Sequence, residues 1–271
     1  MMPFHPAKKT TGRRRLEFAA SAGLLFLLMT AGCGGAQTQV DWEEGGPPTP
    51  ARMTLKEIDR TTLRDFRAVV YKIQTEGLPQ GELYTLWGKK MNSNPVRLAQ
   101  VRLTVDATGR IMAHVPAPNI PMPSGSSIHL PPSEKEFVFN ASGFARGEPF
   151  EISLLDSRMN IRATTRAVPF PIESAGEGPC RLQVELASAG GDFFSVIGIG
   201  FKPNEEVLTI SSSNSSVLEN RRLVNTAGGF VASVNPRVPG KESGTAEYRV
   251  KGGSCQAAVQ YAWGTAALQV E

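Results

Sequence analysis

The sequence predicts an all-β protein built from antiparallel strands, and three observations support this fold class. Its 271 residues include 27 Gly and 20 Pro, but only 13 Phe, 4 Tyr and 3 Trp. This turn-rich composition argues against a helical bundle and against a parallel sheet threaded by helices. From residue 52 onward, short runs alternate between apolar and polar residues. Gly, Pro, Asn and Ser separate these runs, as they do in chains whose strands are joined by tight turns.

The clearest alternation occurs in three segments: 101–106, 246–251 and 256–263. In each of them every second residue is apolar, so that one face of the strand is apolar and the other is largely polar. This pattern is typical of a sheet with one face on a core and the other in water. Residues 52–67 also fit a helical period, but we expect most of this segment to form a first strand and a loop.

A turn pattern appears three times, as Gly-Leu-Pro-Gln-Gly-Glu at 77–82, Gly-Phe-Ala-Arg-Gly-Glu at 143–148 and Gly-Phe-Lys-Pro-Asn-Glu at 200–205. Its first Gly permits backbone geometry that is closed to other residues, and its Glu is placed to accept hydrogen bonds from free turn amides. A second pattern, suited to a hairpin turn, occupies 106–111 and 225–230. No copy of it is recognisable after the middle turn.

The first turn followed by the hairpin turn resembles the immunoglobulin-like repeats of bacterial surface and secreted proteins. The resemblance is best over 178–271 and looser over 60–155. It implies two tandem Ig-like antiparallel β-sandwiches, one at 52–172 and one at 178–271, the second folding independently. Residues 134–172 are too short for a domain of their own, so we assign them to the first sandwich as a partial repeat. Such sandwiches host many roles, so the resemblance specifies fold rather than function.

The N-terminal segment has the layout of a secretory signal. Basic residues within 8–15 precede an uncharged apolar run at 19–31, which is shorter than the ~20 residues of a membrane-spanning helix. The run ends in Thr-Ala-Gly-Cys at Cys33, which resembles a bacterial lipobox. The resemblance implies that 1–32 is a lipoprotein signal peptide and that the Cys33 thiol carries a diacylglycerol, although Thr30 stands where the family usually has Leu. The alternative is an ordinary secreted protein.

The chain from 33 to 51 is rich in Gly, Pro and Gln and has no periodicity, as expected of a flexible tether. We therefore expect the protein to be held at the membrane by its N-terminal lipid, in the bacterial cell envelope. Gly34 and Gly35 replace the Asp that keeps enteric lipoproteins at the inner membrane. This difference favours the outer membrane if the cell has two.

Charge and composition exclude several functions. The formal charge of +4 equals the excess carried by residues 1–32, which hold five basic residues and one Glu. The mature chain is therefore neutral and has no net field for nucleic acid. With three His and three Cys in the whole chain, we expect no metal site, no cofactor and no catalytic residues. The motifs G-x-S-x-G, H-E-x-x-H and C-x-x-C are absent from the sequence.

With Cys33 assigned to lipid, Cys180 and Cys255 remain, and disulfides persist in exported proteins. The first and last strands of an Ig-like sandwich can lie side by side, so we expect a bridge between these two cysteines. In the chain-entropy model such a bridge stabilises the fold by roughly 4 kcal/mol. The alternative is a pair of buried free thiols.

These observations favour a non-enzymatic binding or scaffold module for a protein or glycan partner. The alternative is an accessory carbohydrate- or peptidoglycan-binding module, and an enzyme is the third hypothesis. Carbohydrate binding would need aromatic rings that stand out from a sheet or loop, and the candidates are Tyr84, Trp87, Phe193 and Phe194. The serine-rich segment 211–216 is either a glycan-binding cluster of hydroxyls or a polar loop between strands.

Overall fold

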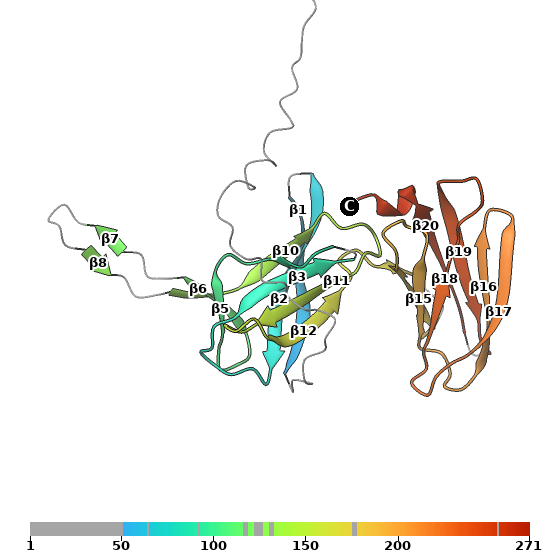
Figure 1. Ribbon diagram of the computed structural model, residues 1–271. Helices are drawn as coiled ribbons and strands as arrows, with labels where there is room; N and C mark the ends of the chain where they lie inside the picture. Colours follow the sequence, from blue (N-terminus) through green and yellow to red (C-terminus); the bar gives the residue numbers. More distant parts are fainter. Residues whose placement is uncertain are drawn as a thin grey trace, which may run out of the picture. The chain divides into compact units, whose positions relative to one another are not determined.

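The computed structural model describes residues 51–271, except 64, 92, 116–118, 122–126, 130–132, 175–177 and 254. These residues form an all-β protein with two antiparallel β-sandwiches in tandem (Figure 1), as the sequence predicts. The predicted signal peptide, Cys33 and the tether up to residue 50 lie outside the described residues. No helix in the described part of the chain is long and apolar enough to cross a membrane; its one helical element is the 3-10 turn η1 (Thr265–Leu268).

The first sandwich consists of two sheets, with strand orders β1-β2-β10 and β12-β11-β3-β4. The strands are β1 (Arg52–Leu63), β2 (Phe66–Glu76), β3 (Thr85–Lys90), β4 (Val96–Arg97), β10 (Val138–Ser142), β11 (Phe150–Leu155) and β12 (Ile161–Ala167). Residues 52–63 are a strand rather than a helix, because they pair antiparallel with β2 along their whole length. Tyr84, Leu86 and Ile152 are among the fully buried side chains of this core.

The second sandwich repeats this arrangement. Its sheets have the orders β13-β14-β15-β18 and β17-β16-β19-β20. The strands are β13 (Ile172–Glu173), β14 (Arg181–Leu186), β15 (Phe194–Ile199), β16 (Glu206–Ser213), β17 (Ser216–Leu223), β18 (Phe230–Val234), β19 (Ser243–Lys251) and β20 (Gln256–Gly264). Strands β14, β15 and β18 match β1, β2 and β10, and the second sheet likewise matches β4-β3-β11-β12. Ile172 belongs to this core, so the sheet begins upstream of residue 178.

An insertion distinguishes the first sandwich from the second. It contains β6 (Ile111–Val115), β7 (Asn119–Pro121), β8 (Ser127–His129) and β9 (Ser133–Glu136) and follows β5 (Arg102–Val105). Arg110 bridges to Gln74 of β2, and β10 then pairs with the same strand from Lys72 onward. The strand of the first sandwich that corresponds to β18 therefore starts at Arg110, is interrupted by the insertion, and continues as β10.

The repeated turn pattern has one backbone geometry in all three copies. Its first and fifth residues adopt positive φ in each: Gly77 and Gly81, Gly143 and Gly147, Gly200 and Asn204. The carboxylate of Glu148 accepts the Ala145 amide at 3.0 Å, and that of Glu205 accepts the Lys202 amide at 2.9 Å. The first copy joins β2 to β3 and the third joins β15 to β16, which are matching strands of the two sandwiches, whereas the middle copy joins β10 to β11. Residues 134–172 thus contain the last strands of the first sandwich.

The hairpin pattern also has a third copy, which is not recognisable in the sequence. At Asp106 and Asn225, a side-chain oxygen accepts backbone amides two and four residues further on. Asp156 does the same with the amides of Arg158, at 2.8 Å, and Asn160, at 3.0 Å. The copy is hard to see in the sequence because Met159, with φ of 65°, occupies the place that glycine takes in the other two turns.

The Asp156 turn predicts an acid-sensitive contribution to stability. Burial opposes ionisation of this carboxyl, but hydrogen bonds from Asn160, Arg162 and Arg158 outweigh that cost and lower its pKa. A lowered folded-state pKa stabilises the fold above the unfolded pKa of about 3.9, and the contribution is lost as pH falls through the folded value. We expect Asp156→Ala to lower the free energy of unfolding by ~2 kcal/mol at pH 7.

Asp156→Asn is the matched control, because Asn225 shows that an amide supports the same turn. Urea unfolding at several pH values should show a smaller loss for Asp156→Asn than for Asp156→Ala. The difference between wild type and Asp156→Asn should shrink below about pH 4. A difference that stays constant down to pH 2 would contradict this account.

Candidate functional site

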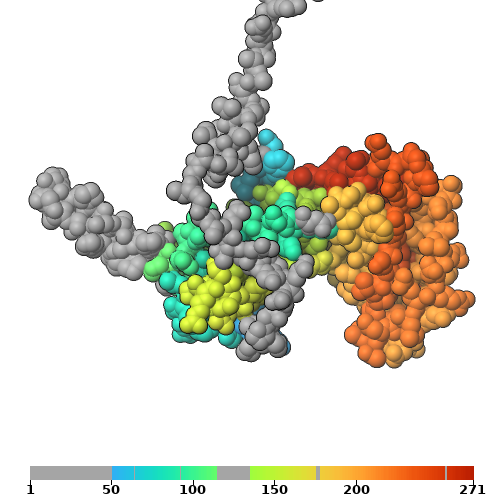
Figure 2. Space-filling view, viewed as in Figure 1, coloured from blue at the N-terminus to red at the C-terminus, as the bar shows by residue number. Residues whose placement is uncertain are grey.

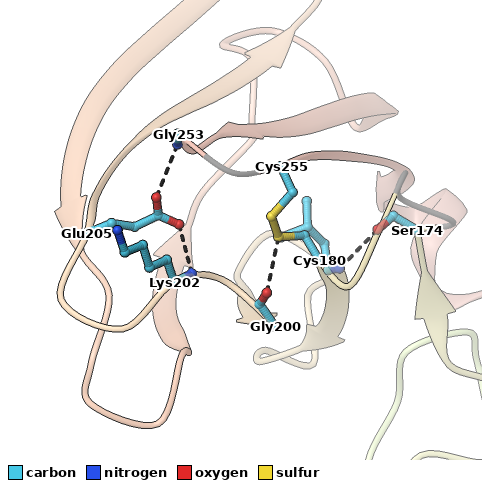
Figure 3. Close-up of a disulfide and its surroundings, with 8 residues drawn as sticks. Ser174, Cys180, Gly200, Lys202, Glu205, Gly253 and Cys255 are labelled. Atoms are coloured by element: carbon cyan, nitrogen blue, oxygen red, sulfur yellow. Dashed lines mark hydrogen bonds between the residues drawn. A yellow bond between two sulfur atoms is a disulfide. The ribbon is translucent and has the colours of Figure 1, made fainter.

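A disulfide joins Cys180, which directly precedes β14, to Cys255, which directly precedes β20 (Figure 3). The two Cα atoms lie 6.2 Å apart, within the usual range for a disulfide. The Sγ atom of Cys180 is fully buried and lies 3.4 Å from the Gly200 carbonyl oxygen. Nearby, the Glu205 carboxylate accepts the amides of Lys202 and Gly253. Turn and bridge thus fasten the same region of the second sandwich, which is a structural role.

A pocket of about 260 Å³ lies on the second sandwich, along strands β16, β17 and β18, which are coloured orange in Figures 1 and 2. We call it the β17–β18 pocket. Most of its lining is polar, with hydroxyl, amide and guanidinium groups around four apolar side chains. The lining residues are Thr209, Ser211, Ser213, Ser216, Val217, Leu218, Asn220, Arg222, Ser233, Val234, Asn235, Pro236, Arg237 and Tyr248.

The pocket forms because the inner face of β16 changes character along the strand. Val207 points into the core, and the residues that follow it on the same face are Thr209, Ser211 and Ser213. Their partners on β17 are Asn220, Leu218 and Ser216, which are exposed although they share this inner face. Strand β18 is the last strand of the opposite sheet. Among the described residues, the inner face of β17 therefore has no apolar cover.

Two buried polar atoms in the lining have no hydrogen-bond partner: the Ser213 hydroxyl and the Arg222 Nε. Other polar groups here are partnered. The Thr209 hydroxyl donates to the Asn220 carbonyl at 3.1 Å, and Arg222 Nη1 donates to the Val231 carbonyl at 3.4 Å. A buried polar group without a partner costs free energy. Both groups belong to residues that line the pocket.

The electrostatics of the pocket favour an anion. Arg222 and Arg237 both line it, and no Asp or Glu is among its described lining residues. Arg221, which is next to Arg222, points to the other face of β17 and pairs with Glu206 at 2.6 Å. Within the described residues, no group of three or more His, Cys, Asp and Glu is placed to hold a metal ion.

Two tyrosines lie on this inner face. Tyr248 lines the pocket and is the cross-strand partner of Ser211. Tyr261 pairs with Ala246 on the neighbouring strand. Burial, and next the proximity of Tyr248, raise the pKa of the Tyr261 phenol well above its usual range. Tyr261 therefore stays neutral at any physiological pH and adds no negative charge beside the pocket.

Some of the residues that the sequence analysis singled out line the pocket, and others are buried in the cores. Ser211, Ser213 and Ser216 line the pocket, whereas the expected loop is only the two-residue turn between β16 and β17. Among the aromatic candidates, Tyr84 and Phe194 are buried in the two cores and Trp87 is half-buried. Phe193 is 47% exposed. The four rings therefore do not form an exposed platform.

Sequence reasoning missed seven polar lining residues, two of which are Thr209 and Ser233. The other five are Asn220, Arg222, Asn235, Arg237 and Tyr248. One signal was present, because the inner positions of a core-forming strand are usually apolar and those of β16 become Thr and Ser. The residues of β17 and β18 carry no such signal, since their approach to β16 depends on the tertiary structure.

Comparisons with known proteins add little to this geometry. No protein-family model and no curated protein matches the chain. One similar solved structure is the crystal structure of a tetra-tandem repeat in the extending region of a large adhesion protein. It is 10% identical to this chain, with a TM-score of 0.24, and the match covers 79% of this chain and 49% of that one.

The unpartnered Ser213 hydroxyl predicts an unusual pair of stability effects. Ser213→Ala removes a buried group that has no partner, so the free energy of unfolding should stay unchanged or rise. Thr209→Val is the matched control on the same strand face. It removes a hydroxyl that donates to Asn220, so it should cost ~1 kcal/mol. Urea unfolding of both variants measures the difference, and equal losses would mean that Ser213 has a partner.

Proposed function

We propose that this protein is a non-enzymatic, lipid-anchored lipoprotein of the bacterial cell envelope, whose second sandwich binds a glycan in the β17–β18 pocket. The lipobox-like sequence that ends at Cys33 supports the anchor, and the Gly-Pro-rich tether supports a folded body held away from the membrane. Gly34 and Gly35 favour the outer membrane in a cell with two membranes. The tandem sandwiches serve as the scaffold that presents the pocket.

The observation that carries the binding function is the chemistry of the pocket. Its hydroxyl and amide side chains both donate and accept hydrogen bonds, as saccharide hydroxyls do. The unpartnered Ser213 hydroxyl and Arg222 Nε supply donors that the protein itself does not use. Tyr248 adds a ring and a phenol. This set resembles a polar binding site more than a surface that packs against a protein core.

The two guanidinium groups narrow the ligand class. Arg binds carboxylates through parallel N–H donors, and such charge-assisted bonds are stronger than neutral ones. Because Arg222 and Arg237 lack an acidic neighbour in the described lining, the favoured ligand is a saccharide that carries a carboxylate. Peptidoglycan, which bears carboxylates, belongs to this class and lies in the same compartment. A scaffold role toward a protein partner is the alternative.

Titration with two oligosaccharides of equal length tests the ligand class. A galacturonic acid oligomer should bind the full-length protein, and a neutral glucose oligomer should bind at least tenfold more weakly. Arg222→Gln and Arg237→Gln should each weaken acidic binding about tenfold, and added salt should weaken it further. Arg221→Gln, on the other face of β17, is the matched control and should leave the affinity unchanged.

The outcomes separate the hypotheses. Equal affinity for both oligomers, with no effect of either pocket arginine, would contradict the carboxylate assignment. Binding of neither oligomer would overturn glycan recognition in this pocket and favour a scaffold for a protein partner.

The membrane anchor is tested separately by mass spectrometry of the protein expressed in a bacterium with two membranes. The membrane fraction should contain a chain that begins at Cys33 and carries acyl groups. Cys33→Ser should release the protein or leave it as a precursor, because serine provides no thiol for the lipid. A wild-type chain that is wholly soluble and begins at another residue would rule out the anchor.

A further inference from the structure

Strand β17 is the free edge of its sheet. The strand order is β17-β16-β19-β20, and β17 pairs only with β16 among the described strands. Seven of its eight residues are exposed, and Arg222 is half-buried. Val217, Leu218 and Leu223 are 60%, 61% and 70% exposed. A long edge strand with apolar side chains is a template for pairing with another strand.

The hairpin decides which backbone groups face the free edge. A two-residue turn, with Asn214 at φ of 52°, connects Ser213 to its partner Ser216. In such a hairpin the closing pair exchanges two backbone hydrogen bonds, and hydrogen-bonded pairs then alternate with pairs that are not. Every second residue from Ser216 onward therefore bonds to β16. The amides and carbonyls of Val217, Glu219, Arg221 and Leu223 face outward.

We propose that β17 pairs antiparallel with β17 of a second copy of this chain, with Asn220 on the two-fold axis. This register places Val217 opposite Leu223 of the second copy and Glu219 opposite its Arg221. By symmetry each pair occurs twice, so the edge supplies roughly eight backbone hydrogen bonds. Apolar and oppositely charged cross-strand pairs both stabilise a sheet.

The charges select this register over its neighbours. Sliding the strands by two residues keeps the faces matched but places Glu219 opposite Glu219, or Arg221 opposite Arg221. Like charges directly opposite destabilise a sheet. Arg221 also pairs with Glu206 on β16 of its own chain, so the register with Asn220 on the axis builds a row of alternating charge. The edge is complementary to itself in this register.

The pairing has a consequence for the pocket. The inner face of β17, which carries Leu218, Asn220 and Arg222, lines the β17–β18 pocket. A two-fold axis perpendicular to the sheet keeps inner faces on the same side. The two pockets of the dimer therefore adjoin, and Arg222 of one copy lies opposite Leu218 of the other. The inference goes beyond the proposed glycan binding and does not depend on it.

A cysteine on the axis tests the register. Pairs that are not hydrogen-bonded have Cα atoms about 4.5 Å apart, within disulfide range. Full-length Asn220→Cys, expressed in bacteria and run on a gel without reductant, should contain a reducible dimer. Val231→Cys is the matched control, because Val231 is 63% exposed on the edge strand β18. It should stay monomeric, as should the parent chain.

Charge changes in the Asn220→Cys chain separate a specific pair from random collision. Glu219→Arg places like charges opposite each other twice. The amount of disulfide-linked dimer should therefore fall about tenfold. Adding Arg221→Glu restores opposite charges and should restore the dimer. The loss of the exposed Arg221–Glu206 pair should matter little.

Two results would overturn the proposal. One is a cross-link that ignores both charge changes, and the other is an Asn220→Cys chain that stays monomeric while its native disulfide is intact. Sedimentation of the wild-type protein in detergent provides a measurement without any substitution. It should show a dimer that Glu219→Arg dissociates.

Discussion

Both sandwiches depend on the backbone geometry of one turn, which connects β2 to β3 in the first sandwich and β15 to β16 in the second. That turn needs two residues at positive φ, which L side chains rarely adopt. Gly77 and Gly81 supply them in the first sandwich, and Gly200 and Asn204 in the second. At Gly200 a Cβ atom would lie 2.1 Å from the Pro179 carbonyl oxygen, so glycine is required there. Because this turn sends β3 and β16 into the opposite sheet, the shared strand order follows from it.

The second sandwich combines a rigid end with an open side. At one end, the disulfide and the Glu205 hydrogen bonds hold the start of β14, the turn at 200–205 and the segment before β20 together. Along β16, the inner positions pass from Val207 to hydroxyl side chains. An apolar continuation would have extended the core, and the polar one leaves two buried groups without partners. Polar groups of this kind are tolerated where a ligand completes their hydrogen bonds.

Strand β17 contributes both to the pocket and to the free edge of its sheet. The inner residues of β17 and Val217 line the pocket, while the outward-facing backbone groups and outer side chains form the charged and apolar edge. Natural edge strands often carry charges that discourage pairing. Here Glu219 and Arg221 have opposite signs and are spaced two apart, so the charges discourage most partners but match a second copy. Glycan recognition and self-association would then be neighbouring properties of one hairpin.

The sequence by itself determined the fold class, because strand alternation and tight-turn residues are local signals. It also offered Cys180 and Cys255 as a pair, and Ser211 to Ser216 as a polar cluster. It missed the turn at Asp156, since Met159 occupies a position where glycine is expected. Only the tertiary structure decided that the serines face Arg222, Arg237 and Tyr248 across a pocket. The physical reason is that a pocket depends on which strands lie opposite each other and where a sheet ends, and neither is a property of local sequence.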